Sequence, residues 1–156
     1  MNKKKKKNKI ICRNKKIYFN YFIKKTFKAG LVLKGWEIKS VRKNMVDISN
    51  SYLIYKNFEI FLLNCRINPI KTTSINVDLD VSRTKKILLK KKEILFIKNN
   101  IQRKNYSLVP ISMFWKKSWC KIKISLSKGK KNIDKREIKK TNTIKKELSR
   151  ISKNFY

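Results

Sequence analysis

The 156-residue chain carries 43 Lys and Arg residues against 9 Asp and Glu residues, a formal net charge of +34. So basic a chain attracts polyanions, and nucleic acid is the leading partner because each neutralised phosphate releases counterions. No apolar run is long enough to span a bilayer, and no apolar signal core follows the basic N-terminus. We therefore expect a cytoplasmic protein without a membrane partner, with one domain plus extensions.

The first third of the chain opens on a cationic segment. Residues 1–13 contain no acid, and a block of like charge predicts a disordered arm. Residues 19–33 are ambiguous, because Phe22 and Phe27 could share a helix face, but aromatic and β-branched residues favour a strand bent at Ala29-Gly30. A short amphipathic helix should follow, with its apolar positions at i, i+3 and i+7 at Ile38, Val41 and Met45.

The middle of the chain alternates between strand and helix signals. Residues 51–67 predict a hairpin that turns at Lys56-Asn57. Residues 71–81 are polar and irregular, which favours a loop. From Arg83 onward the sequence predicts a helix that Asp80 or Ser82 could cap and that ends at Asn99-Asn100. Its core-facing apolar residues repeat at seven positions, at Ile87, Leu88, Ile94 and Leu95.

Two more strands are predicted at residues 106–115 and 118–127, because Cys120, Ile122, Ile124 and Leu126 alternate with polar residues. Beyond Ser127 the chain loses core-forming residues and gains cations. Apolar residues at helical spacing, Ile144, Leu148, Ile151 and Phe155, predict an amphipathic helix. No further core-forming segment remains for this helix to pack against. Such a helix is marginal in water, so we expect it to be disordered alone and to fold on its target.

These elements predict a mainly β fold. About five or six short strands with two interposed helices suggest an oligonucleotide-binding-type closed antiparallel barrel with two to three short helices and a basic C-terminal tail. The predicted division is a basic arm over 1–13, an RNA-binding barrel over 14–127 and a basic tail over 128–156. We expect a monomer when the protein is free.

Catalytic chemistry has few residues to draw on. The chain has no histidine, which excludes Ser-His and Cys-His dyads. Its three cysteines lack metal-ligand or redox spacing. Asp78 and Asp80 are the only close acidic pair, and a turn or cap role is more probable for them than acid–base or metal chemistry. We expect no enzymatic activity, no metal and no cofactor.

Seven collinear segments resemble the SsrA-binding protein family, and the resemblance covers about residues 14 to 151. They are Asn14-Lys15-Lys16, Tyr21-Phe22-Ile23, the run 33–42 (LKGWEIKSVR), the run 83–89 (RTKKILL), Phe114-Trp115-Lys116, the run 119–124 (WCKIKI) and the run 128–136 (KGKKNIDKR). The resemblance implies an oligonucleotide-binding-type barrel that binds the tRNA-like domain of transfer-messenger RNA. It further implies delivery of that RNA to stalled ribosomes for trans-translation.

The resemblance also implies two sets of site residues. The RNA-binding set on the barrel is Asn14, Lys15, Lys16, Glu37, Lys39, Arg42, Lys85, Lys86 and Leu88. The ribosome-binding tail, which would enter the decoding region and the empty mRNA channel as a helix, is represented by Lys128, Gly129, Lys130, Lys131, Asp134, Lys135, Arg136 and Ile151.

Three positions depart from the family pattern. Lys28 stands where the family's Phe-Glu-Ala-Gly has its acid, Ile133 replaces an aromatic or histidine that can stack on a base, and Asp80-Val81 replaces Asp-Pro. Reduced RNA specificity compensated by charge is one hypothesis for these changes. Two other classes remain as alternatives: a ribosomal subunit structural RNA-binding protein and a small RNA-cleaving enzyme.

Overall fold

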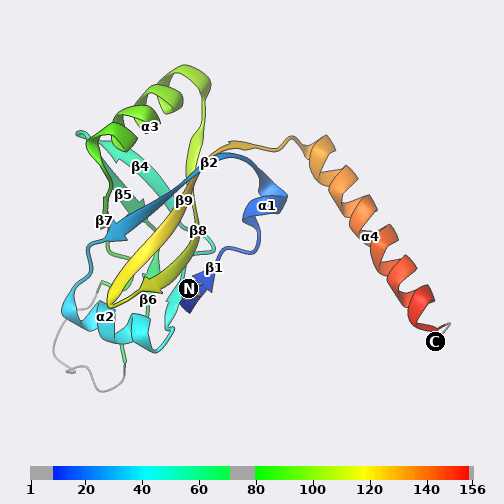
Figure 1. Ribbon diagram of the computed structural model, residues 1–156, viewed down its shortest axis with the longest axis horizontal. Coiled ribbons are helices and arrows are strands. Elements are labelled where there is room, and N and C mark those ends of the chain that lie inside the picture. The colour runs from blue at the N-terminus through cyan, green and yellow to red at the C-terminus, as the bar shows by residue number, and fades with distance from the viewer. Residues whose placement is uncertain (1–8, 71–79, 155–156) are drawn as a thin grey trace, which may run out of the picture.

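The computed structural model describes residues 9–70 and 80–154 of the chain (Figure 1). Within these residues the elements are β1 (Lys9–Arg13), α1 (Ile17–Asn20), β2 (Tyr21–Leu31), α2 (Gly35–Arg42), β3 (Val46–Asp47), β4 (Tyr52–Lys56), β5 (Glu59–Leu63), β6 (Arg66–Ile67), β7 (Lys85–Leu88), α3 (Lys91–Lys104), β8 (Ser107–Lys116), β9 (Trp119–Gly129) and α4 (Asn132–Asn154).

The main sheet closes on itself. Its strand order is β1-β8-β4-β5-β7-β2-β9, and the additional pairing of β8 with β9 completes a ring of antiparallel strands. The long β8 pairs along one edge with β9, while its other edge takes β4 at Leu108 and β1 from Ser112 to Trp115. Closure removes unpaired strand edges. The mainly β, oligonucleotide-binding-type barrel predicted from the sequence is confirmed.

The barrel interior follows the alternation in the strands. Ile122, Ile124 and Leu126 of β9 are fully buried, because successive side chains of a strand point to opposite faces. The helices add Val41 from α2 and Ile97 from α3 to the same core. Burying apolar surface at about 25 cal/mol per Å² makes this interior the main source of stability.

Several predicted elements are confirmed. Residues 35–42 form α2, with Val41 buried as the apolar pattern requires. The prediction was wrong for Met45, which lies beyond the helix end, after Asn44 has taken a positive φ of 59°. The predicted hairpin is β4–β5, although its two-residue turn is Asn57-Phe58, one position later than expected. The final two strands are β8 and β9, and β2 occupies the first ambiguous segment after the short helix α1.

Other boundaries differ from the sequence-based expectation. Lys9–Arg13, assigned to the arm, pairs with β8 as β1. The prediction that a helix starts at Arg83 is wrong, because residues 85–88 form β7 and α3 begins only at Lys91. Its end was also wrong: α3 runs through Asn99-Asn100 to Lys104 and stops where Asn105 takes a left-handed conformation. Most of the predicted loop at 71–81 lies outside the described residues.

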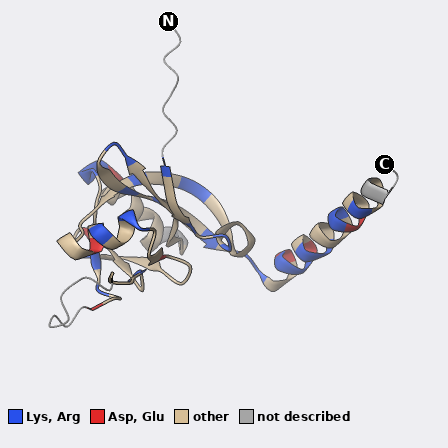
Figure 2. Ribbon diagram, turned by 90° about the horizontal axis from the view of Figure 1, so that it is seen from below, with Lys and Arg blue, Asp and Glu red and all other residues tan. Residues whose placement is uncertain are grey.

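Strand β9 passes through the predicted boundary at Ser127 and ends at Gly129, which pairs with Tyr21. Helix α4 then leaves the barrel and projects away from it (Figures 1 and 2). Its side chains from residue 139 to 152 are all exposed. That the free tail is disordered and folds on the ribosome stays a prediction. In the described part of the chain, no helix is long and apolar enough to cross a membrane.

Candidate nucleic-acid interface

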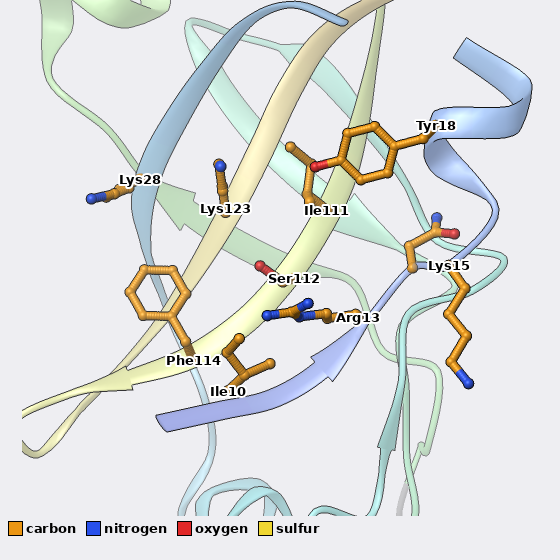
Figure 3. A pocket seen from close by; sticks show the side chains of 10 residues that line it. Ile10, Arg13, Lys15, Tyr18, Lys28, Ile111, Ser112, Phe114 and Lys123 are labelled. Carbon is orange, nitrogen blue, oxygen red and sulfur yellow. The ribbon is translucent and has the colours of Figure 1, made fainter. Parts of the chain in front are cut away.

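A groove of about 700 Å³ opens on the barrel surface where β1 pairs with β8 and where β2 pairs with β9 (Figure 3). It is lined by side chains of four strands, of the segment that leads into α1 and of α1 itself. These residues are Ile10, Arg13, Asn14, Lys15, Tyr18, Lys28, Ile111, Ser112, Phe114 and Lys123. The lining of the groove therefore combines apolar and aromatic side chains with cationic ones.

The charge of the groove has one sign. Arg13, Lys15, Lys28 and Lys123 line it, and its lining contains no carboxylate. Lys28 of β2 lies directly opposite Lys123 of β9 in the strand register. Like charges in directly opposed cross-strand positions destabilise a sheet, and an anion bound between them would relieve the repulsion. The groove has the electrostatic character of a phosphate-binding surface.

The corner between β1 and α1 is held by Asn14. Its backbone N–H donates to the carbonyl of Ile111 at 2.9 Å, and its side-chain oxygen accepts from the Lys16 N–H at 3.1 Å. Asn14 is almost fully buried, whereas Tyr18 in the turn that follows is 62% exposed. Asn14 thus fixes the path of the chain, and Tyr18 presents an aromatic ring on which a base could stack.

Glu37 lies elsewhere, and the expectation that it contacts RNA directly is corrected. Its side chain is fully buried and forms an ion pair with Arg83 at 2.6 Å. It also accepts a hydrogen bond at 2.6 Å from the backbone N–H of Lys34, the residue before α2. A buried carboxylate with these partners ties α2 to the segment preceding β7, and no face of it is open to a ligand.

Lys85 is corrected in the same way. Its buried ammonium donates to the carbonyls of Cys65 at 3.0 Å and Arg83 at 2.8 Å. A carboxylate oxygen of Glu37 lies 3.6 Å from the same nitrogen. These partners match the three donors of an ammonium group. Lys85 therefore belongs to the barrel interior, as does Glu37.

The remaining barrel residues of the predicted set reach the surface at separate places. Lys16 is exposed just before α1, and Lys39 and Arg42 are exposed on α2. Lys86 on β7 forms an ion pair with Glu59. Leu88 is half exposed and packs closely beside Gly30 of β2, where an added Cβ would come within 3.3 Å of it. Of the predicted set, the structure places only Asn14 and Lys15 in the groove lining.

The start of the tail is anchored to the rim of the groove. The backbone N–H of Lys130 donates to the carbonyl of Asn20 at 2.9 Å, and its ammonium donates to the carbonyl of Tyr18 at 2.8 Å. The same ammonium lies 4.7 Å from the centre of the Phe22 ring. Because Tyr18 also lines the groove, Lys130 links the root of the tail to the candidate RNA surface.

The predicted tail residues divide between strand and helix. Lys128 and Gly129 complete β9, and Lys131 precedes α4. The carboxylate of Asp134 accepts from the backbone N–H of Lys131 at 2.9 Å, which satisfies one of the free donors at the helix start. Lys135, Arg136 and Ile151 lie along α4, and Ile151 is half exposed.

The predicted site set leaves out Arg13, Tyr18, Lys28 and Lys123 of the groove, although the sequence marks Lys28 as a departure from the family pattern. The alternation in β9 did indicate that Lys123 faces outward. Its position opposite Lys28 depends on the register between β2 and β9, which includes a bulge between Ile23 and Lys25. That bulge carries no residue pattern that the sequence alone would reveal.

Metal binding has little support in the part of the chain that the structure describes. It contains no group of three or more His, Cys, Asp or Glu side chains that could hold a metal ion. Burial raises the pKa of Cys12 to about 11 and the pKa values of Cys65 and Cys120 to about 12. These thiols therefore stay protonated at neutral pH, which disfavours both nucleophilic attack and metal ligation.

The closed barrel, the cationic groove beside its first turn and the projecting basic helix define a class of small β-barrel proteins with a surface suited to polyanions. Comparison with known proteins gives the family. The family model described as "SmpB protein" matches residues 11–154, and the chain belongs to this SmpB, or SsrA-binding, protein family. The resemblance found in the sequence is confirmed.

Individual relatives agree with this assignment. The chain is 47% identical over 148 residues to the SsrA-binding protein of Buchnera aphidicola subsp. Schizaphis graminum, covering 94% of this chain and 91% of the relative. It is 43% identical over 143 residues to that of Acidovorax sp. strain JS42, covering 92% and 91% of the two chains. A chain from the solved structure "tmRNA-SmpB: a journey to the center of the bacterial ribosome" matches with a TM-score of 0.64 and 30% identity, covering 81% of this chain and 92% of that chain.

Proposed function

We propose that this protein binds the tRNA-like domain of transfer-messenger RNA and delivers it to stalled ribosomes, where the C-terminal tail enters the decoding region and the empty mRNA channel. Its relatives are SsrA-binding proteins, and a matching solved structure concerns a tmRNA–SmpB assembly and the bacterial ribosome. The protein acts in the cytoplasm, where ribosomes are, and has no enzymatic role of its own.

The observation that carries the proposal is the cationic groove joined to the root of the tail. Arg13, Lys28 and Lys123 would neutralise phosphates of the structured RNA, and Tyr18 would stack on an unpaired base. Lys15 and Lys16 extend the charge along the same edge. The exposed Lys39, Arg42, Lys86 and Leu88 would widen the contact over α2 and β7, while Glu37 and Lys85 support it from inside the barrel.

The tail would act after the barrel is bound. Lys130 holds the root of the tail against α1, so that RNA bound in the groove and the start of α4 occupy fixed relative positions. Beyond Lys131 the side chains that α4 presents include many basic residues and an exposed apolar stripe. Both features suit a segment that lies in an RNA-lined channel and becomes ordered there.

Salt-dependent binding tests the groove. Removing two phosphate contacts with Lys28→Gln and Lys123→Gln should reduce the slope of log affinity against log salt by about 1.4 to 1.8. It should also weaken binding of transfer-messenger RNA more than binding of an unrelated tRNA. The control variant, Lys43→Gln with Lys56→Gln, removes two exposed cations outside the groove and should leave the preference for transfer-messenger RNA unchanged. Equal behaviour of the two variants would contradict the assignment of the groove.

Truncation tests the tail. Ending the chain after Ser127 would remove the last strand pairs of β9 as well as α4, so the cleaner cut is after Lys131. That truncation should keep binding of transfer-messenger RNA within about twofold and abolish rescue of ribosomes stalled on mRNA without a stop codon. If the truncated chain still folds but loses both activities, then RNA binding is not a function of the barrel alone and the proposed separation of roles is wrong.

A further inference from the structure

The hairpin between β4 and β5 is built around an unusual residue. Lys56 pairs with Glu59, so the turn consists of Asn57 and Phe58 alone. Both have positive φ, 49° and 58°, the arrangement of a type I′ hairpin turn that favours Asn followed by Gly. Asparagine tolerates this backbone and glycine adopts it freely, whereas a bulky residue is a genuine outlier there. The fold alone favours glycine at position 58.

Core packing does not compensate for this strain, because the Phe58 side chain is 70% exposed. It stands at one side of a pocket of about 410 Å³ between the hairpin and α3, within the roughly 300–1,000 Å³ typical of ligand sites. Tyr55 meets Phe58 edge to face at 6.4 Å between ring centres. Ile94 and Leu95 of α3 form the opposite wall, and Leu95 is itself half exposed.

The rim of this pocket is cationic. Lys91 and Lys98 line it, and the ammonium of Lys98 lies 4.8 Å from the centre of the Phe58 ring. The acids closest in sequence already have partners: Glu59 pairs with Lys86, and Glu93 accepts the backbone N–H of Lys90 at 3.0 Å. An aromatic floor with unpaired cations at its edge fits a flat, uncharged ring that is linked to an anionic group.

We propose that this pocket binds an unpaired nucleotide of RNA, with its base stacked on Phe58 and its phosphate beside Lys91 and Lys98. Stacking on an aromatic ring flanked by cations is the usual mode of single-strand recognition. None of the residues that line the pocket lines the cationic groove, so the inference stands independently of the proposed function.

The test uses the full-length protein and Phe58→Gly. This substitution changes no charge and supplies the residue that the turn favours. The probe is a single-stranded hexaribonucleotide with 4-thiouridine near its centre, crosslinked by light and mapped by mass spectrometry. We expect the wild-type chain to crosslink at Phe58. In Phe58→Gly, affinity for the oligonucleotide should fall about tenfold with an unchanged salt slope, while the melting temperature rises. Phe58→Trp should restore the affinity.

A matched control is Asn64→Gly, which places glycine at another exposed position of positive φ, 53°, outside the pocket. It should leave oligonucleotide affinity unchanged. The proposal is overturned if Phe58→Gly binds the oligonucleotide as tightly as the wild type, or if it melts at a lower temperature. Binding of an acidic amphipathic peptide that competes with the oligonucleotide and is equally sensitive to Phe58→Gly would instead make this a protein-docking site.

Discussion

The barrel and helix α4 use the same residue types in opposite ways. In the barrel, Glu37 and Lys85 are completely enclosed, and each donor or acceptor that they direct inward has a protein partner. On α4, every side chain from residue 139 to 152 is exposed, including the apolar Ile144 and Leu148. The buried charges of the barrel stabilise the fold, whereas the exposed charges of α4 are available to bind a partner.

This contrast shows how a chain of net charge +34 folds at all. Two of the few acids offset cations of the barrel: Glu37 pairs with Arg83 and Lys85, and Glu59 pairs with Lys86. Many of the cations that remain unpaired lie in the groove and on the tail, where Figure 2 shows Lys and Arg along the projecting helix. These are surfaces whose charge a polyanion could neutralise.

The largest expected difference between the two regions is in thiol reactivity. Burial raises the pKa of Cys65 to about 12 from a usual value of 9.0, so near pH 8 its thiolate fraction is about a thousandfold below that of a free thiol. A thiol introduced on α4 by Ser149→Cys should show no such protection, because Ser149 is exposed. We therefore expect iodoacetamide to label position 149 first and Cys65 at least a thousandfold more slowly, measured site by site by mass spectrometry.

Unfolding the chain in urea provides the control for this measurement, since it should make the two positions react at similar rates. The stability contributed by the buried thiol has a definite pH dependence. Because the folded pKa is raised, this contribution is present below pH 9 and is lost as the pH rises above that value. Equal labelling rates in the native protein would mean that the barrel opens readily around Cys65.

Removing one carboxylate should have the next largest effect, and only in the barrel. Glu37→Ala leaves Arg83 and the buried Lys85 without their counter-charge and should lower the free energy of unfolding by about 3–5 kcal/mol. Glu147→Ala, the matched change on the exposed helix, should alter it by no more than about 0.5 kcal/mol. Urea denaturation followed by circular dichroism distinguishes the two. A small effect at Glu37 would show that the buried ion pairs do not hold α2 to the barrel.

Much of the fold could be predicted from the sequence because apolar and polar residues alternate strongly in the barrel strands. Ile122, Ile124 and Leu126 identify β9 without any tertiary information. The error at residues 85–88 arose because Ile87 and Ile94 are seven residues apart, which mimics one helix face although they belong to β7 and α3. The true helix start carries a capping box in which Glu93 accepts the Lys90 N–H, but a lysine at the cap is not a residue type that signals one.

The candidate site was harder to predict, because whether a side chain is buried or exposed depends on partners that are distant in the sequence. Glu37 lies in a signature segment of the family, but its partner Arg83 is 46 residues away, so no local pattern indicates that the carboxylate is buried. Conversely, Lys28 had been noted as a departure from the family pattern. The pairing of β2 with β9 is what places it opposite Lys123 and in the groove.

The smallest expected effect on folding concerns the first turn of α4. Changing Asp134, Lys135 and Arg136 together to alanine removes the carboxylate that accepts the Lys131 N–H. Loss of such a cap weakens a helix by about 1 kcal/mol, so the first turn should fray in NMR spectra while the melting temperature of the barrel stays within about 2 °C. The matched control changes Lys146, Glu147 and Arg150 to alanine, which alters the net charge of the same helix equally without touching its start. A fall of the barrel melting temperature in the first variant alone would mean that the root of the tail is an integral part of the folded body.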